Sequence, residues 1–249
     1  MNTKVKHSIE AFALASPNQE VCGFIVCAPP EVLVHPCANI SKDADGQEQT
    51  FEIDPQEYIS ACGRGKVVGL YHSHPHGTAA FSEEDLKVAR ELELPSHVFA
   101  VEDKQWEHYI PDGYIVQLTG VPFTWGIADC LETVRLYYRQ KLGVYLGDYD
   151  RDETFKEAAP DAILQHVESE GFINLGVDIS LAREHDVLLF DTPGHRYPHH
   201  LGVYIGGNRL LHHPYGALSR IDDLDGHLLA RLLGVLRYGT EVQARPAKV

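Results

Sequence analysis

The chain has 249 residues, of which 44% are hydrophobic and 23% are charged, and this composition fits one large or two modest globular domains. Its formal net charge of −15 argues against nucleic acid as a general partner, because phosphate groups would be repelled. No apolar run approaches the ~20 residues of a membrane-spanning helix, so no membrane span is expected. The five cysteines lack paired spacing, which argues against a disulfide framework and indicates synthesis in a reducing compartment.

The first half of the sequence mixes helical and strand patterns, as α/β domains do. Asp54-Pro55-Gln56-Glu57 is a strong helix start, with Asp as the N-cap and Pro at the first helical position. We expect helices at 5–15, 55–62 and 83–94, strands at 21–26, 31–36, 67–71, 97–101 and 106–110, and a polar surface loop at 39–48.

A break at Pro111-Asp112-Gly113 predicts two domains, of residues 1–112 and 113–249. In the second domain a helix begins at Cys130, and an acidic, turn-rich segment at 147–153 precedes a helical region that is interrupted at Pro160 and ends at Gly171. Strands are expected at 186–190, 200–205 and 209–212, with Gly206-Gly207-Asn208 as a hairpin turn.

Three metal-ligand candidates lie close together in the first domain, at His72, His74 and Asp85. Residues two apart on a strand point to the same face, so the two histidines that follow the buried strand 67–71 can reach one ion. Ser82 is a helix N-cap candidate, with Asp85 at the third helical position, and this turn would return the carboxylate towards the imidazoles. Two histidines and one carboxylate leave an open fourth position, as catalytic zinc sites do. Alone, the Ser-x-x-Asp unit is only a cap, and a His-x-His pair often binds no metal.

The joint pattern H-x-H-x7-S-x-x-D after a buried strand resembles the JAMM metallopeptidase family, also called MPN-plus. The resemblance implies a mixed-sheet α/β fold in which His72, His74 and Asp85 hold Zn²⁺. It also implies that Glu20 is the general base for hydrolysis of a peptide or isopeptide bond, and that Ser82 stabilises the oxyanion or the attacking water. Without that pattern, a lone Glu before a strand is ordinarily a solvated residue.

A second constellation surrounds Cys130, which lies where a glycine-bearing loop enters a helix. The positive end of a helix dipole favours the thiolate form of a cysteine. A nucleophilic cysteine also needs a base, and His200 and His212 lie on the two strands of the predicted hairpin. The alternative is a buried, inert cysteine with two incidental histidines.

The set W-G-x-x-D-C before a helix, then H-x-G-x-Y-x-G, then a histidine twelve positions after the first, resembles the NlpC-like cysteine peptidases. The resemblance implies a papain-like α+β fold with Cys130 as nucleophile, His200 as base and His212 as the orienting residue. Asp129 would help to position the substrate. Members commonly cut the peptide stems of bacterial peptidoglycan.

The sequence departs from that family at two places. Leu131-Glu132 follows the cysteine where many members have Ser-Gly, and Leu118 stands where an upstream Tyr is often found. These changes leave open an alternative in which the peptidase folds serve as binding scaffolds.

The order of the two domains resembles that in tail tip proteins of long-tailed bacteriophages. This resemblance implies synthesis in the host cytoplasm, a place at the virion tail tip, other tail tip proteins as partners, and action at the host cell wall. Enzyme and structural assembly component remain the two alternatives.

Overall fold

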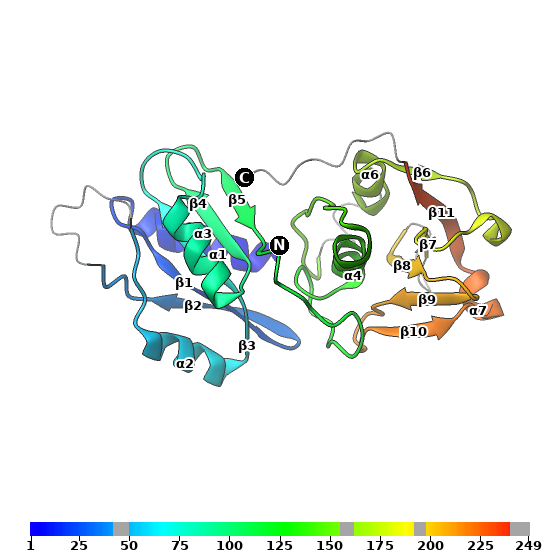
Figure 1. The fold of residues 1–249 in the computed structure, drawn as a ribbon, viewed down its shortest axis with the longest axis horizontal. Coiled ribbons are helices and arrows are strands. Elements are labelled where there is room, and N and C mark those ends of the chain that lie inside the picture. The colour runs from blue at the N-terminus through cyan, green and yellow to red at the C-terminus, as the bar shows by residue number, and fades with distance from the viewer. Residues whose placement is uncertain (42–49, 155–161, 192–197, 240–249) are drawn as a thin grey trace. The chain divides into compact units, whose positions relative to one another are not determined.

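The computed structural model describes residues 1–41, 50–154, 162–191 and 198–239 (Figure 1). The chain divides into two compact units, one of residues 2–115 and the other of Met1 with residues 116–249. This division reflects the contacts within each unit and does not define a domain boundary. The predicted boundary between residues 112 and 113 therefore stays a prediction. Parts of the predicted loop 39–48 and the predicted interruption at Pro160 lie outside the described residues. Among the described residues, no helix is long and apolar enough to cross a membrane.

The first unit contains a five-stranded mixed sheet of order β2-β1-β3-β4-β5. Only the β3–β4 pair is parallel, and α3 lies between these two strands in the sequence. The elements are α1 (Thr3–Ala15), β1 (Cys22–Ala28), β2 (Glu31–Cys37), α2 (Pro55–Arg64), β3 (Lys66–His74), α3 (Glu83–Leu92), β4 (Ser96–Ala100) and β5 (Trp106–Tyr109).

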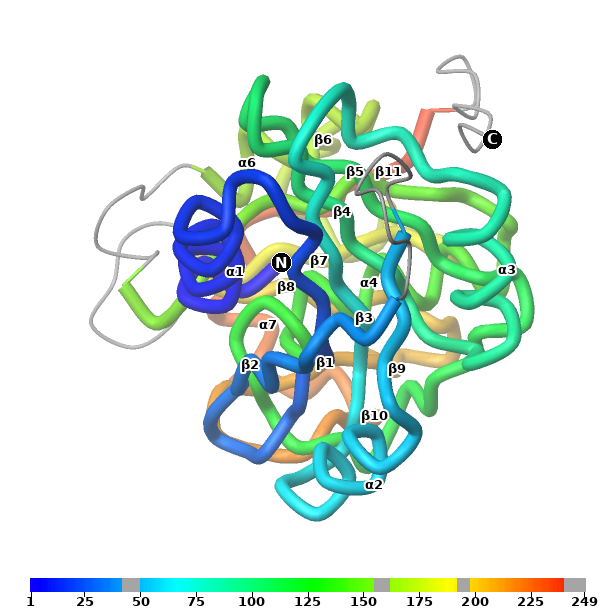
Figure 2. The backbone as a smooth tube through the Cα atoms, turned by 90° about the vertical axis from the view of Figure 1, so that its left-hand side faces the viewer, coloured from blue at the N-terminus to red at the C-terminus, as the bar shows by residue number. Residues whose placement is uncertain are grey.

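Helices cover both faces of this sheet. On one face, Ala61 of α2 and Val88 of α3 pack with Phe24 and Leu70 in one hydrophobic cluster. Helix α1 lies on the opposite face and buries Val5, Ile9 and Ala13 (Figure 2). Parallel strands that are covered on both faces are buried, which explains the nearly continuous apolar run in β3.

Two boundaries differ from the predictions, and the first of them matters for the site. Strand β3 continues to His74, so both predicted histidine ligands are strand residues and their side chains share one face. Helix α3 ends at Leu92 rather than at residue 94, because Glu93 adopts a left-handed conformation with a φ of 51°.

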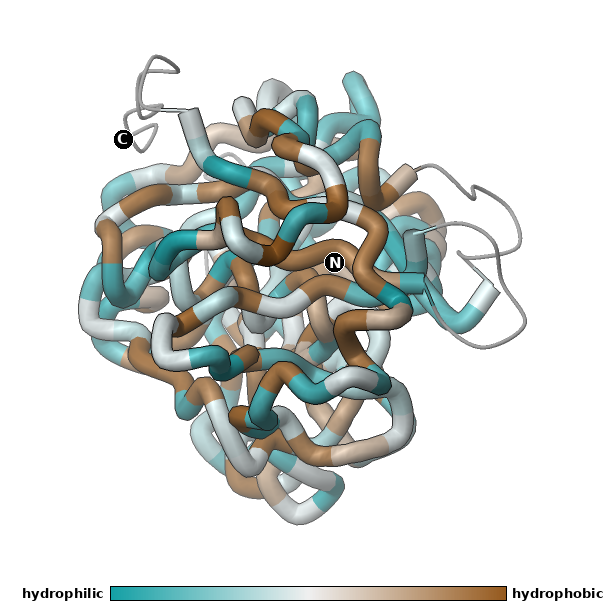
Figure 3. Tube along the Cα trace, turned by 90° about the vertical axis from the view of Figure 1, so that its right-hand side faces the viewer, coloured by the Kyte–Doolittle hydropathy of each residue, from teal (hydrophilic) through white to brown (hydrophobic). Residues whose placement is uncertain are grey.

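The second unit contains a six-stranded antiparallel sheet of order β10-β9-β8-β7-β11-β6. Hydrophobic and hydrophilic stretches alternate along the chain in Figure 3. The elements are α4 (Cys130–Tyr137), the π-helix η1 (Tyr138–Leu142), α6 (Ala162–Ser169), β6 (Phe172–Asn174), the 3₁₀-helix η2 (Ile179–Leu181), β7 (Val187–Phe190), β8 (His200–Tyr204), β9 (Arg209–His212), β10 (Arg220–Asp223), α7 (Gly226–Leu229) and β11 (Leu232–Tyr238).

The hairpin β8–β9 forms as predicted and fixes the register of the two histidines. Gly206, Gly207 and Asn208 all have positive φ angles, which a tight hairpin turn requires and which glycine and asparagine adopt readily. Gly202 lies opposite His212 in the β8–β9 pair. His200 comes two residues before Gly202 on β8, so the side chains of His200 and His212 lie on the same face of the sheet. A Cβ atom at Gly202 would lie 2.9 Å from the Cβ of His212, so glycine is needed for this close approach.

Candidate catalytic sites

The structure brings His72, His74 and Asp85 together in a buried cluster. Their side-chain atoms face one another: the two Nε2 atoms are 3.1 Å apart, and the carboxylate oxygens lie 3.3 Å from Nε2 of His72 and 3.8 Å from Nε2 of His74. Ligands about 2.0–2.1 Å from a tetrahedral zinc ion are separated by roughly 3.3 Å. The cluster is therefore compatible with a metal ion.

Neighbouring groups orient each of these three side chains. Nδ1 of His74 donates to the carbonyl of Thr78 at 2.8 Å, which leaves the lone pair on Nε2 towards the cluster. The ring of Phe51 stacks on His72 at 4.5 Å. The backbone N–H and the hydroxyl of Ser82 donate to Oδ2 of Asp85 at 2.8 and 2.7 Å, so one capping box both starts α3 and aims a ligand.

Glu20 lies beside this cluster, and two hydrogen bonds tie its neighbour Val21 to Ser73 of β3. Val21 N–H donates to the hydroxyl of Ser73 at 3.0 Å, and Ser73 N–H donates back to the Val21 carbonyl at 2.9 Å. Glu20 is only 6% exposed, and its Oε1 has no hydrogen-bond partner among the described residues. A buried carboxylate oxygen without a partner is costly unless a bound group or water satisfies it.

Burial and charge set the protonation of these groups. Burial raises the pKa of Glu20 to about 7, with His74 opposing and Asp85 reinforcing the rise. Burial would also raise the pKa of Asp85, but the nearby imidazoles of His72 and His74 and the hydrogen bond from Ser82 together hold it well below its usual range. Burial lowers the pKa of His72. In His74 burial is the largest single effect and lowers the pKa, but Asp85, the Thr78 carbonyl and Glu20 together outweigh it and raise the pKa. A carboxylate that titrates near neutrality suits proton transfer.

The second predicted set gathers around a cavity of about 600 Å³ in the other unit. Cys130 is the first residue of α4, and α4 packs on β8. Aromatic side chains of Phe123, Trp125 and Tyr215 form part of the wall. The three predicted residues Cys130, His200 and His212 all line this cavity.

A chain of hydrogen bonds leads from His200 to a carboxylate that the sequence did not reveal. Nε2 of His200 lies 2.8 Å from Nδ1 of His212, and Nε2 of His212 lies 3.0 Å from Oδ2 of Asp222. The carboxylate can only accept, so neutral His212 donates from Nε2 and accepts at Nδ1. His200 therefore carries its proton on Nε2, which leaves Nδ1 as its basic nitrogen.

Burial and charge also act on this chain. Burial lowers the pKa of His212, and Asp222 opposes that effect. Burial is the largest single effect on Asp222 and raises its pKa, but the hydrogen bonds and charges of Arg220 and His212 together lower the pKa overall, so the carboxylate is ionised at neutral pH. The acceptor at the end of the chain is thus charged and fixes the direction of both hydrogen bonds.

Asp129, which was expected to position substrate, has a structural role instead. Nε and Nη2 of Arg151 donate to its two oxygens at 2.7 and 3.0 Å, and the backbone N–H groups of Gly126 and Glu132 add two more bonds. Asp129 is fully buried and Arg151 is 2% exposed. The carboxylate is thus consumed in holding the start of α4, and it cannot contact a substrate.

Each half of the chain matches a known protein family. Residues 2–109 match the prokaryotic homologs of the JAB domain, and residues 120–237 match the NlpC/P60 family. The predicted fold classes, a JAMM-like mixed-sheet domain followed by a papain-like NlpC-type domain, are confirmed. The NlpC/P60 match indicates a peptidase of the cysteine class in the second domain.

Two relatives with the same description align along much of the chain. Tail tip assembly protein K of Escherichia phage N15 is 30% identical over 240 residues, which cover 96% of each chain. Tail tip assembly protein K of Escherichia phage lambda is 29% identical over 168 residues, 68% of this chain and 80% of the relative. The chain belongs to the tail tip assembly protein K family. A solved NlpC/p60 domain of peptidoglycan hydrolase SagA aligns with 47% of this chain and 88% of its own at 22% identity, with a TM-score of 0.31, and adds nothing to this assignment.

Proposed function

We propose that this protein is a bacteriophage tail tip component with two hydrolytic sites, one cysteine-based and one zinc-dependent. The names of its relatives support the place in the tail, with other tail tip proteins as partners. Synthesis in the host cytoplasm and action at the host cell wall belong to the same proposal. The observation that carries the enzymatic part is the hydrogen-bonded chain His200–His212–Asp222 at the cavity that Cys130 also lines.

The cysteine site follows from this chain of hydrogen bonds. Nδ1 of His200 takes the proton from Cys130, and the helix N-terminus stabilises the thiolate. The thiolate attacks a peptide carbonyl, and His200 returns the proton to the leaving amine as the acyl-enzyme forms. Water then hydrolyses the acyl-enzyme with His200 as the base. The substrate we propose is the peptide stem of peptidoglycan.

The zinc site uses Glu20 as the group that moves protons. His72, His74 and Asp85 would hold the ion, which when bound supplies Lewis acidity towards water and a peptide or isopeptide carbonyl. Glu20, with its pKa near neutrality, takes a proton from the attacking water and delivers it to the leaving amine. The hydroxyl of Ser82 donates to Asp85, so its role towards an oxyanion requires that bond to be given up.

Digestion of purified peptidoglycan tests the cysteine site. The full-length chain is compared with Cys130→Ala and with Cys62→Ser, a control at an exposed cysteine, and released fragments are identified by mass spectrometry. We expect cleaved stem peptides from the wild type and the control only. Equal release by Cys130→Ala would refute the proposal.

The two residues after Cys130 that depart from the NlpC-like pattern have structural roles: Leu131 packs in the core and Glu132 pairs with Arg135.

Complementation separates the enzyme from the structural alternative. Phage particles that carry Cys130→Ala or Glu20→Gln are assayed for infectivity. Loss of infectivity with normal tail assembly supports catalysis, whereas full rescue by both variants would leave the folds as binding scaffolds.

A further inference from the structure

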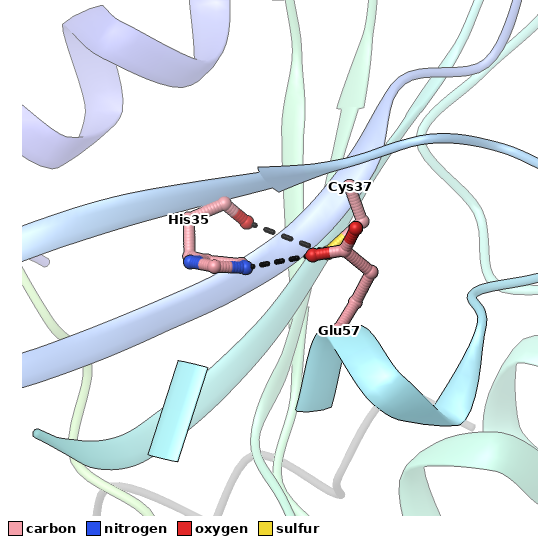
Figure 4. Close-up of side chains that lie close together, drawn as sticks. All are labelled: His35, Cys37 and Glu57. Carbon is pink, nitrogen blue, oxygen red and sulfur yellow. Dashed lines mark hydrogen bonds and ion pairs between the residues drawn. The ribbon is translucent and has the colours of Figure 1, made fainter. Parts of the chain in front are cut away.

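A second cluster of metal-ligand side chains lies at the edge of the first unit's sheet. It consists of His35 and Cys37 on the edge strand β2 and Glu57 on α2 (Figure 4). Nε2 of His35 lies 3.0 Å from Oε2 of Glu57, and one ligand atom from each of the three residues lies within 4.8 Å of the others. None of these residues takes part in the two sites described above.

This second cluster, His35–Cys37–Glu57, repeats the plan of the His72–His74–Asp85 cluster. In both, two ligands are separated by one residue on a strand, so that their side chains share a face. In both, the carboxylate is the third residue of the next helix, Glu57 of α2 and Asp85 of α3. The carboxylate of Glu57 takes no part in capping α2, whose N-cap is Asp54, so it remains available as a ligand.

We propose that His35, Cys37 and Glu57 bind a second zinc-class divalent ion. One imidazole, one thiolate and one carboxylate are all ligands that Zn²⁺ accepts. The side chain of Glu57 is 39% exposed, so solvent can supply the fourth ligand. The ion would tie the edge strand to α2.

Binding requires two protons to be rearranged. The thiol of Cys37 donates to the carbonyl of His35 at 3.7 Å, and the ion would take the place of that proton. Nη1 of Arg64 lies 3.1 Å from Nδ1 of His35, and because guanidinium can only donate, His35 now carries its proton on Nε2. A metal at Nε2 reverses this tautomer, so the exposed side chain of Arg64 must swing away and acts as a competitor of the ion.

Cobalt distinguishes the two clusters, because only the second contains sulfur. The full-length protein is freed of metal and titrated with Co²⁺, and the near-ultraviolet sulfur-to-cobalt charge-transfer band is recorded. We expect the band to saturate at one equivalent per chain and to be lost in Cys37→Ser. It should persist in the double variant His72→Ala with His74→Ala, and in Cys62→Ser, a matched control on the same helix.

Arg64 gives a test in the opposite direction. In Arg64→Gln the amide oxygen can accept from Nδ1–H of a metal-bound His35, so the Kd for Co²⁺ should fall roughly tenfold or more. Arg64→Lys keeps a donor at that place and should gain little. If Cys37→Ser fails to fold by circular dichroism, His35→Gln replaces it. Absence of the band in the wild type, its survival in the folded Cys37→Ser or His35→Gln variant, or its loss in Cys62→Ser would overturn the proposal.

Discussion

Cys130 is the residue whose reactivity most directly reports on the proposed nucleophile. We expect it to react with iodoacetamide faster than the other four cysteines at pH ~6.5, where ordinary thiols are protonated. Cys22 and Cys37 should be slow, because burial raises their pKa values to about 12 and about 11. Peptide mapping by mass spectrometry measures the five rates. His200→Ala should remove most of the advantage of Cys130 and His212→Ala less, and equal labelling of all cysteines would contradict the assignment.

Asp222 is the residue that the sequence did not reveal, and it should matter through the histidine tautomers. Asp222→Ala removes the acceptor that keeps the proton of His212 on Nε2, so we expect a loss of roughly 10- to 100-fold in peptide-stem hydrolysis. The smaller the fraction of His200 with a basic Nδ1, the slower Cys130 alkylation should become. Glu168→Gln, which removes an exposed charge on α6, serves as the control. Unchanged alkylation and hydrolysis in Asp222→Ala would show that the carboxylate does not act through this chain.

Glu20 gives the metal-free protein a pH dependence whose sign is fixed by its raised pKa. The folded state holds this proton up to about pH 7, and the unfolded chain releases it near 4.5. The stabilisation is therefore complete below pH ~4.5 and is lost as pH rises through about 7. Between pH 5 and 8 the wild type should lose about 1–3 kcal/mol more free energy of unfolding than Glu20→Gln.

Urea unfolding in the presence of chelator measures this difference. Of the two tryptophans, Trp106 reports on the first unit, so a Trp125→Phe background isolates the signal. Parallel pH profiles for wild type and Glu20→Gln would refute the expected protonation of Glu20.

At the scale of elements, the start of α4 depends on a buried ion pair. Arg151→Met would leave the carboxylate of Asp129 buried without its partner, which should destabilise the second unit by about 3–5 kcal/mol. Adding Asp129→Asn removes the buried charge and should restore much of that loss. Unfolding followed by Trp125 in a Trp106→Phe background measures both. Equal destabilisation in the single and double variants would show that the unpaired charge is not the cause.

Elements that follow from local spacing were predictable, and those that depend on long-range pairing were not. His72, His74 and Asp85 were found because strand alternation and the first helical turn are local geometry. The hairpin that carries His200 and His212 was found from its Gly-Gly-Asn turn. Strand β10, with its charged sequence Arg220–Asp223, and β11, whose apolar run fits a helix as well as a strand, were missed.

The side-chain contacts that could not be predicted from the sequence also depend on long-range pairing. Asp222 reaches His212 only because β10 pairs with β9, and Arg151 reaches Asp129 across 22 residues of sequence. Neither pairing leaves a pattern in the local sequence, so the role of Asp129 was misassigned from resemblance alone. Buried polar partners of this kind are fixed by the tertiary structure, which a single sequence does not display.

At the scale of the whole molecule, two chemistries on one chain should respond to different inhibitors. A chelator removes the ion that His72, His74 and Asp85 would hold. The proposed Cys130 mechanism uses no ion, so chelation should leave that site intact. Iodoacetamide at low concentration and pH ~6.5 blocks Cys130 first and spares a site that contains no thiol. Each reagent should therefore abolish one hydrolytic activity and leave the other.

The measurement uses the full-length chain with two substrates, purified peptidoglycan for the cysteine site and a peptide library for the zinc site. Stem-peptide release should survive chelation and be lost on alkylation, and zinc-dependent cleavage should show the reverse pattern and return when Zn²⁺ is added back. Glu20→Gln and Cys130→Ala should reproduce the two inhibitor patterns, because each removes the proton carrier or the nucleophile of one site only. Loss of both activities with either reagent would mean that the two sites depend on each other, and the reading of the chain as two separate hydrolytic units would fail.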